Sequence, residues 1–409
     1  MNSKQLFQIA LDLTPPWYIE RVEFTEKEKG QRQLDIHINF QRGAKFADEK
    51  GNECPVHDTE ERSWQHLSFF QHLCFLHARV PRIKTSSGKV RTVQLPWARA
   101  GSRFTLLFEA FAMALIENEM PVSKAASILN VYPHRLWNVF KYWIARALAK
   151  DDQSKVKKLG IDETSKQKGH DYVTIAADLD ERRVIFVCEG KEENAVKQLN
   201  KHLVNKNVNP EQIENIAIDM SSAYISGVTK YFPKASIVFD RFHIVKHLND
   251  AVNEVRIKER KEHESLKGHK YTFLKKDKHL TYEQKISKYE LILDYPALGE
   301  AVRLRELFND FWDFNEKEEA SAFIAFWCDL VDDSNIIPFK KFANMIRSHW
   351  SGIVNYVDAK ISNGILEGIN SKIQLAKRRA RGYRNTDNFI SMIYFIAGKL
   401  EFDYPHYST

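Results

Sequence analysis

The sequence predicts a multidomain α/β protein in which a mixed sheet is interrupted by a long helical segment. Between residues 151 and 241, β-rich runs alternate with amphipathic helices. From 242 to 360 the apolar spacing is helical throughout, whereas residues 1–100 contain short β-rich runs that precede a helical pair at 101–150. With 409 residues, 43% of them hydrophobic, the chain is long enough for about two to four domains with packed cores.

The charged residues are clustered along the chain. There are 61 Lys and Arg residues and 54 Asp and Glu residues, which gives a net charge of +7. Acidic residues crowd 46–61, whereas cations gather at 79–103, 255–278 and 372–384. Clustered cations are typical of proteins that bind a polyanion, and double-stranded DNA is the first candidate.

Cysteine usage and hydropathy favour a soluble, cytoplasmic protein without a membrane partner. The cysteines are scattered and form no C-x-x-C pair, which disfavours a disulfide framework and favours a reducing compartment. They are Cys54, Cys74, Cys188 and Cys328. Residues 1–24 lack the basic-then-apolar pattern of a signal peptide. No apolar run reaches the length of a membrane span.

Residues 1–100 are expected to form a small β domain. Strand-like runs lie at 18–25 and 33–40, the second alternating as LDIHINF. Cys54 and His57 then have the spacing of half a zinc knuckle. The expected second half, RIKTSSGKVRTV, contains neither Cys nor His, and the residues that could replace it are His66, His72, Cys74 and His77. The sequence therefore leaves two alternatives open, a zinc-binding β domain and a metal-free one.

Residues 101–150 have the outline of a helix-turn-helix. A first helix is predicted at 122–129, a turn at 130–133 and a longer second helix at 134–148. An ordinary helical hairpin has the same outline, but the basic residues favour DNA contact. The candidate DNA-contacting residues are Lys124, Arg135, Asn138 and Lys141, of which Arg135 and Asn138 are the candidates for base edges.

Beyond a polar break at 151–155, the order of elements is typical of a ribonuclease-H-like fold, in which three antiparallel strands are followed by parallel additions. The predicted elements are strands at 156–161, 172–178 and 183–189, a helix at 192–204, a strand at 213–218, a helix at 222–232 and a strand at 235–239. Residues 151–241 would form the first part of this catalytic domain, and 242–360 a helical insertion. Residues 361–409 would add its C-terminal helix and a basic tail.

Three carboxylates are the candidate catalytic residues. Asp162 and Asp219 each close a predicted strand, and Glu367 lies on the later helix, on one face with Asn370 and Gln374. Because sites form at the carboxyl ends of strands in α/β sheets, the two aspartates would converge if their strands were neighbours. Oxygen-only ligation suits two Mg²⁺ or Mn²⁺ ions that act on a phosphodiester. Each aspartate alone could equally cap a turn.

The predicted helix that carries Glu367 continues into a basic run. Its cations are Lys372, Lys377, Arg378, Arg379, Arg381 and Arg384. A solvated amphipathic helix with a basic end has the same composition. Beside a metal site, however, such cations are expected to contact the phosphates of DNA.

Four motifs together resemble the transposases of the ISL3 insertion-sequence family. They are GIDE at 160–163, AIDMSSAY at 217–224, FDRFHIVK at 239–246 and SNGILEGINSKIQLAKRRARGYRN at 362–385. The segment before the helix-turn-helix, VPRIKTSSGKVRTVQLPWARAGSRFTLLFEAF, is also similar to that family. The resemblance extends over nearly the whole chain, from about Cys54 to Leu400.

This resemblance implies a DDE recombinase that binds the terminal inverted repeats of its own element and acts as a homodimer or larger assembly. Asp162, Asp219 and Glu367 match the catalytic triad of the family. Asp240, in the FDRFH motif, is implied to support the metal site or to position substrate; its alternative role is to cap the helix that begins near Phe242.

The resemblance breaks down in the N-terminal segment, because Thr85 and Gly88 stand where the family usually has its second Cys-containing half. Two other functions share most of these features. One is a DNA-binding regulator that has kept a transposase body without cleavage. The other is a nuclease of the ribonuclease-H superfamily that uses the same triad without recognising transposon ends.

Overall fold

The computed structural model describes residues 2–27, 32–85, 87–166, 172–190, 192–261, 264–275, 279–361 and 364–405. These residues divide into two compact units. Unit 1 comprises 1–151 with 376–381 and 400–409, and unit 2 comprises 152–375 with 382–399. Ser362 and Asn363, which begin the last of the four motifs, lie outside the described residues.

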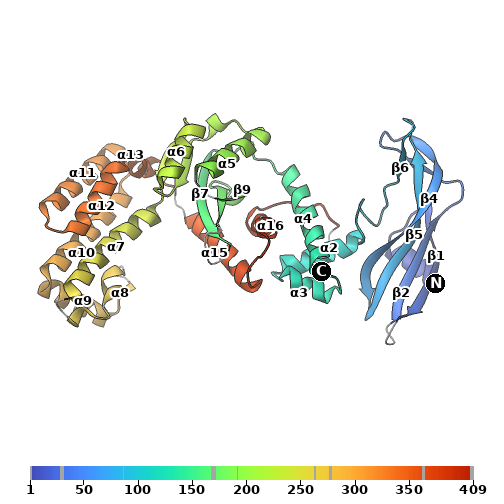
Figure 1. Cartoon of the computed structure of the whole chain (residues 1–409), viewed down its shortest axis with the longest axis horizontal. Helices are drawn as coiled ribbons and strands as arrows, with labels where there is room; N and C mark the ends of the chain where they lie inside the picture. The colour runs from blue at the N-terminus through green and yellow to red at the C-terminus, as the bar shows by residue number, and fades with distance from the viewer. Residues whose placement is uncertain are drawn as a thin grey trace. The chain divides into compact units, whose positions relative to one another are not determined.

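Unit 1 begins with a short helix and a six-stranded sheet (Figure 1). Its elements are α1 (Ser3–Ala10), β1 (Trp17–Glu26), β2 (Arg32–Phe40), β3 (Lys45–Ala47), β4 (Glu53–Phe69), β5 (His72–Lys84) and β6 (Val90–Thr92). The strand order is β1-β2-β5-β4-β3, with β6 paired to β5. The expected alternation in β2 is confirmed, because Leu34, Ile36 and Ile38 are all buried. The small β domain predicted for the N-terminal segment is therefore a sheet built around a long β4–β5 hairpin.

Three helices of unit 1 follow, α2 (Leu106–Glu117), α3 (Val122–Ile128) and α4 (Pro133–Lys150). Of these, α3 and α4 correspond to the two helices of the predicted helix-turn-helix. Thr105 caps α2 by accepting a hydrogen bond from the Phe108 amide at 3.2 Å. Pro133 occupies the first turn of α4, where the missing N–H of proline costs nothing. In the intervening turn, Asn130 has a φ of 53°, a left-handed conformation that asparagine tolerates well. The predicted helix–turn–helix order is thus confirmed.

Unit 2 contains a five-stranded mixed sheet in the order β11-β10-β7-β8-β9. Its strands are β7 (Lys158–Ser165), β8 (Tyr172–Asp178), β9 (Arg183–Glu189), β10 (Asn215–Ile218) and β11 (Ser236–Phe239), joined by α5 (Glu193–Asn205), a short 3₁₀ turn (Pro210–Gln212) and α6 (Ser222–Tyr231). β7, β8 and β9 are antiparallel, whereas β10 is parallel to both β7 and β11. These directions are the ones expected from the sequence.

One strand boundary was wrong. Asp162 was expected to close a strand that ended at Ile161, but β7 continues to Ser165. Its antiparallel pairing with β8 extends from Leu159 opposite Asp178 to Ser165 opposite Tyr172. Asp162 therefore lies inside the strand, where β8 holds its backbone.

The described residues between β11 and the last two helices form helical elements only. These are α7 (Arg241–Arg260), α8 (Lys270–Leu274), α9 (Tyr282–Asp294), α10 (Pro296–Asn309), α11 (Lys317–Asp333), α12 (Ile337–Ser348), α13 (Trp350–Val354) and α14 (Tyr356–Ala359), with 3₁₀ turns at Glu264–Leu266 and Asp310–Asp313. The chain then forms α15 (Gly364–Arg379) and α16 (Thr386–Ala397).

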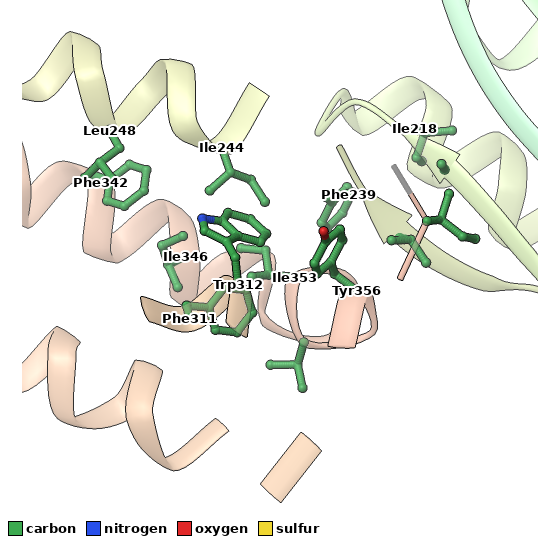
Figure 2. Close-up of a cluster of buried hydrophobic side chains, with 14 of the residues drawn as sticks. Ile218, Phe239, Ile244, Leu248, Phe311, Trp312, Phe342, Ile346, Ile353 and Tyr356 are labelled. Carbon is green, nitrogen blue, oxygen red and sulfur yellow. The ribbon is translucent and has the colours of Figure 1, made fainter. Parts of the chain in front are cut away.

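The helices of this segment share one core with the sheet of unit 2. Figure 2 shows Ile218 and Phe239 at the ends of β10 and β11, with Ile353 and Tyr356 of the helical segment beside Phe239. The close approach depends on Gly352, because a Cβ there would overlap the Phe239 ring. The helical segment is thus packed directly onto β11, the edge strand beside β10.

α15 packs against β7 on the face that carries the even-numbered residues of that strand. A Cβ on Gly160 would lie 2.8 Å from both Leu366 of α15 and Leu179. Two and four residues further along β7, Asp162 and Thr164 form hydrogen bonds to α15. Glycine at position 160 lets the helix approach the strand closely enough for these bonds.

Candidate active site and DNA-contacting residues

Asp162 and Asp219 lie at the same level on neighbouring parallel strands. Ala217 of β10 pairs with Gly160 of β7, and each aspartate lies two residues beyond that pair. The sequence predicted that the two aspartates converge if their strands are neighbours. In the structure β7 and β10 are neighbours, so this condition is met. Asp219 follows directly after β10, and its Oδ1 accepts a hydrogen bond from the Ser221 amide at 2.9 Å.

Asp162 is held by two hydrogen bonds. Its Oδ1 accepts from the Glu163 amide at 2.8 Å, and its Oδ2 accepts from Nδ2 of Asn370 at 2.7 Å. Burial raises the pKa of Asp162, and the negative charge of Asp240 raises it further, whereas the hydrogen bonds and His243 lower it. A buried carboxylate with a raised pKa gains from a positive charge beside it.

Glu367 lies on the same flank of α15 as Asn370 and Gln374, three residues before Asn370, as the helical spacing predicts. The amide of Gln374 donates to Oγ1 of Thr164 at 3.0 Å. Glu367 itself is exposed, whereas Asn370 is partly buried. Within the described residues, no group of three or more His, Cys, Asp or Glu side chains converges closely enough to hold a metal.

Asp240 follows β11 and caps α7. Its Oδ1 accepts a hydrogen bond from the Phe242 amide at 2.9 Å, which is the capping role weighed from the sequence. Asp240 is also one residue beyond the pairing of Phe239 with Ile218, so it continues the level of Asp219 on the next strand. His243 lies on its other side, with 3.8 Å between Nε2 and Oδ2 of Asp240. The sequence reasoning missed His243, although its position in the FDRFH motif was a signal.

The donor set beside Asp162 suits a hard divalent cation. Its functional atoms are carboxylate oxygens and an amide oxygen, the ligands that Mg²⁺ and Mn²⁺ prefer. Oδ1 of Asn370 is buried, and no hydrogen-bond partner for it lies within the part of the chain that the structure describes. A buried amide oxygen on the residue that bonds to Asp162 fits such an ion, with Asp162 and Asp219 as the residues that would hold it.

The residues of the N-terminal segment do not fit a zinc ion. Cys54 is buried in the sheet core, whereas His57, three positions further along β4, is exposed. The register of β4 shifts between Val56 and Asp58, so His57 lies at an irregular point of the strand, at the surface and away from the core that holds Cys54. The possible replacements are engaged elsewhere: His66 contacts Thr105, His72 packs on Phe24, Cys74 is buried, and His77 bonds to Ser63 and Asp35.

The four DNA-contact candidates of the helix-turn-helix differ in exposure. Lys124 and Asn138 are exposed, and Lys141 is partly buried. Arg135 is also partly buried, because its guanidinium lies 4.5 Å from the centre of the Phe104 ring. Asn138 is therefore better placed than Arg135 to reach a base edge.

The basic run at the end of α15 is largely exposed. The exposed cations are Lys372, Arg378, Arg379, Arg381 and Arg384, whereas Lys377 is partly buried. Arg379 forms an ion pair with Glu119, which lies between α2 and α3. The other four exposed cations present their charge to solvent.

Comparison with known proteins agrees with this architecture. A family model described as "Transposase" matches residues 159–393, and one described as "Helix-turn-helix domain of transposase family ISL3" matches residues 93–144. Fold and matches together define a transposase of the DDE class with a helix-turn-helix. The first model covers more than half of the chain. The chain belongs to the ISL3 family of transposases.

Two curated relatives are similar over nearly their whole length. The transposase for insertion sequence element IS1001 of Bordetella parapertussis is 26% identical over 387 residues, which cover 92% of this chain and 94% of that protein. The transposase for insertion sequence element IS1557 of Mycobacterium tuberculosis, from strain CDC 1551 / Oshkosh, is 23% identical over 429 residues, covering 96% and 95%. DDE transposases generally use divalent metal ions. In the described part of the chain, no helix is both long and apolar enough to span a bilayer.

Proposed function

We propose that this protein binds the terminal inverted repeats of its insertion sequence and cleaves and joins DNA strands at those ends. The observation that carries the proposal is the placement of Asp162 and Asp219 at one level on adjacent parallel strands. Such a pair repels unless a cation lies between the carboxylates. The strand directions, with three antiparallel strands and two parallel additions, support assignment of unit 2 to a ribonuclease-H-like catalytic domain.

In this proposal each acidic residue has a defined task. Asp162 and Asp219 hold the cations, and Glu367 completes the site from α15. When bound, the two ions supply Lewis-acid chemistry that activates water and stabilises the departing 3′ oxygen of the phosphodiester. Asp240 caps α7 and keeps a further negative charge beside Asp162.

The DNA-contacting residues divide into two groups. Lys124, Asn138 and Lys141 of the helix-turn-helix would contact the inverted repeat, with Arg135 in a supporting position against Phe104. The cations after Glu367 would hold phosphates near the cut, a contribution that depends on salt and little on sequence. They are Lys372, Lys377, Arg378, Arg379, Arg381 and Arg384.

The remaining sequence expectations stay part of the proposal. The domains would be 1–100, 101–150, 151–241, 242–360 and 361–409.

Because two transposon ends must be cut, the active assembly would be a homodimer or larger. Light scattering of the protein bound to end DNA would measure it, and a single protein copy per complex would contradict it.

The test is cleavage of an inverted-repeat duplex with Mg²⁺ or Mn²⁺. We expect E367Q to lose cleavage by about 1,000-fold or more, as for removal of a group that acts in the transition state, while binding to the repeat is retained. The matched control is E290Q, an exposed carboxylate on α9, which should cleave like the parent. Parent-like cleavage by E367Q would contradict the assignment of Glu367.

Two further results identify the rival functions. Binding of the repeat without cleavage by the parent in either metal would indicate a DNA-binding regulator. Equal cleavage of the repeat and of a scrambled duplex would indicate a ribonuclease-H-superfamily nuclease.

A further inference from the structure

We infer that Asn370 is part of the cation site, where its amide nitrogen orients Asp162 and its amide oxygen is a further donor toward the bound ion. This inference rests on the proposed function of Asp162 as a cation-holding residue. Asn370 lies outside the acidic triad, and its amide is uncharged, so its role in the site differs from that of the three carboxylates.

The first support is the geometry at Asp162. The Asn370 amide and the Glu163 backbone each donate to a different oxygen of the carboxylate, at 2.7 and 2.8 Å. With one fixed donor on each oxygen, the plane of the carboxylate is set before any ion arrives. A carboxylate oxygen offers about two lone pairs, so each still has one available for a cation.

The second support is the orientation of the Asn370 amide. If nitrogen and oxygen were exchanged, Oδ1 would face the carboxylate of Asp162, and two acceptors would repel each other. The hydrogen bond therefore assigns Oδ1 to the other side of the amide. There it is buried, and it lacks a hydrogen-bond partner among the described residues. A buried acceptor without a partner is costly, and a hard cation or its bound water would satisfy it.

The third support is that Asn370 does not hold the helix alone. Gln374, one turn further along α15, donates to Thr164, two residues further along β7, at 3.0 Å. One helical turn rises about 5.4 Å and two strand residues span about 6.6 Å, so both amides can bind the same strand face. The pair sets the position of α15 along β7, and with it the height of Glu367 relative to Asp162.

Gln374 provides the matched control, because it makes the same kind of bond but touches no carboxylate. A purely structural role of Asn370 predicts that N370A and Q374A behave alike. A role in the cation site predicts that they differ in metal binding while losing similar thermal stability. The measurement is Mn²⁺ binding to the full chain without DNA, followed by electron paramagnetic resonance of the free ion, together with the melting temperature without metal.

We expect N370A to bind Mn²⁺ about 10- to 100-fold more weakly than the parent, as for other residues that orient a metal ligand. Q374A should remain within about 3-fold, since it leaves the carboxylate of Asp162 untouched. Should N370A fail to fold, N370S, which retains a small hydroxyl, is expected to bind at an intermediate level. Parent-like Mn²⁺ binding by a folded Asn370 variant, or equal loss in Q374A, would overturn the inference.

D162N separates this inference from the proposed function. If D162N binds Mn²⁺ as tightly as the parent, Asp162 does not hold the cation and the proposed site itself fails. If D162N loses Mn²⁺ while N370A keeps it, the site stands and only the role of Asn370 fails.

Discussion

Nδ2 of Asn370 lies 2.7 Å from Oδ2 of Asp162, although the two residues are 208 positions apart in the chain. The bond joins α15 to the central strand β7, although the whole helical segment from α7 to α14 is inserted between β11 and α15. Since Glu367 precedes Asn370 by less than one turn, this contact also brings the third acidic residue to the side of the sheet where Asp162 and Asp219 lie. The insertion thus lengthens the chain between β7 and α15, while Asp162 and Asn370 remain in contact within unit 2.

The space around two helical glycines predicts opposite effects for their substitution by alanine. A Cβ at Gly352 would overlap the buried ring of Phe239, so G352A should lower the free energy of unfolding by about 1–3 kcal/mol. At Gly368, on α15, no described heavy atom lies within 4 Å of an added Cβ. G368A should therefore stabilise the protein by about 0.5–1 kcal/mol through helix propensity. Urea unfolding followed by circular dichroism measures both, and a stabilised G352A would contradict the packing argument.

A buried carboxylate should be essential for the helix-turn-helix region. Glu109 is fully buried and accepts hydrogen bonds from Arg99 at 2.9 Å, Ser102 at 2.6 Å and Trp143 at 2.8 Å. E109A leaves these donors unpaired and should cost about 3–5 kcal/mol of unfolding free energy. E109Q keeps an acceptor and should cost about 1–2 kcal/mol.

The readout for these variants is tryptophan fluorescence during urea unfolding, because Trp143 is one of the three donors. E119A, which removes an exposed carboxylate between α2 and α3 and its surface ion pair with Arg379, serves as the control and should change stability little, because exposed ion pairs contribute little. Equal stability of E109A and E119A would show that the buried network contributes nothing.

The stability of unit 1 should fall in mild acid because of His66. Burial lowers the pKa of His66 from its ordinary value of 6.5 to about 4. Between these values the unfolded chain binds a proton that the folded chain does not, so stability is lost as the pH falls from 6.5 to 4. The full loss is on the order of 3 kcal/mol.

The check is to compare the parent with H66Q at pH 7.5 and pH 4.5 by urea unfolding. H66Q removes the titrating ring. Its free energy of unfolding should therefore fall less than that of the parent as the pH is lowered, and the difference should be the loss attributed to His66. H57Q, which changes an exposed histidine of the same strand, should decline like the parent. If H66Q and the parent decline equally, burial of His66 does not govern the acid response.

Recognition of the inverted repeat should depend more on Asn138 than on Arg135. Asn138 is exposed on α4, whereas the guanidinium of Arg135 lies over the Phe104 ring. N138A should reduce the preference for the repeat over a scrambled duplex by about 1–3 kcal/mol. R135A should keep this preference within about 0.5 kcal/mol of the parent's value, and its main effect should be a lower stability of the helix-turn-helix. Fluorescence anisotropy with both duplexes distinguishes the two, and a larger specificity loss in R135A would reverse the assignment.

Lys372 should contribute to DNA affinity without contributing to specificity. It is exposed on α15, one turn and a half beyond Glu367. If it contacts a phosphate, K372A should lower the slope of log affinity against log salt by about 1, equally for repeat and scrambled DNA. K285A, on the exposed side of α9, should leave the slope unchanged, and the same slope in K372A and the parent would exclude a phosphate contact.

Local patterns were sufficient for most elements of the fold. The alternation of apolar and polar residues predicted β2. The small residues and Pro133 predicted the helix-turn-helix, and the order of strands and helices predicted the sheet of unit 2. These features depend on neighbours in sequence, so the sequence can report them. The end of β7 was misjudged because its last residues are held by β8, a contact that no local pattern of β7 encodes.

The sequence by itself determined which acidic residues to examine, the class of DNA-acting protein that the motifs resemble, and the helical face shared by Glu367, Asn370 and Gln374. Only the tertiary structure decided that Asp162 and Asp219 lie at one level, that Cys54 is buried whereas His57 is exposed, and that Arg135 lies over Phe104. The physical reason is that spacing along one element follows from its own period, whereas adjacency of strands and burial of a side chain follow from packing between distant segments.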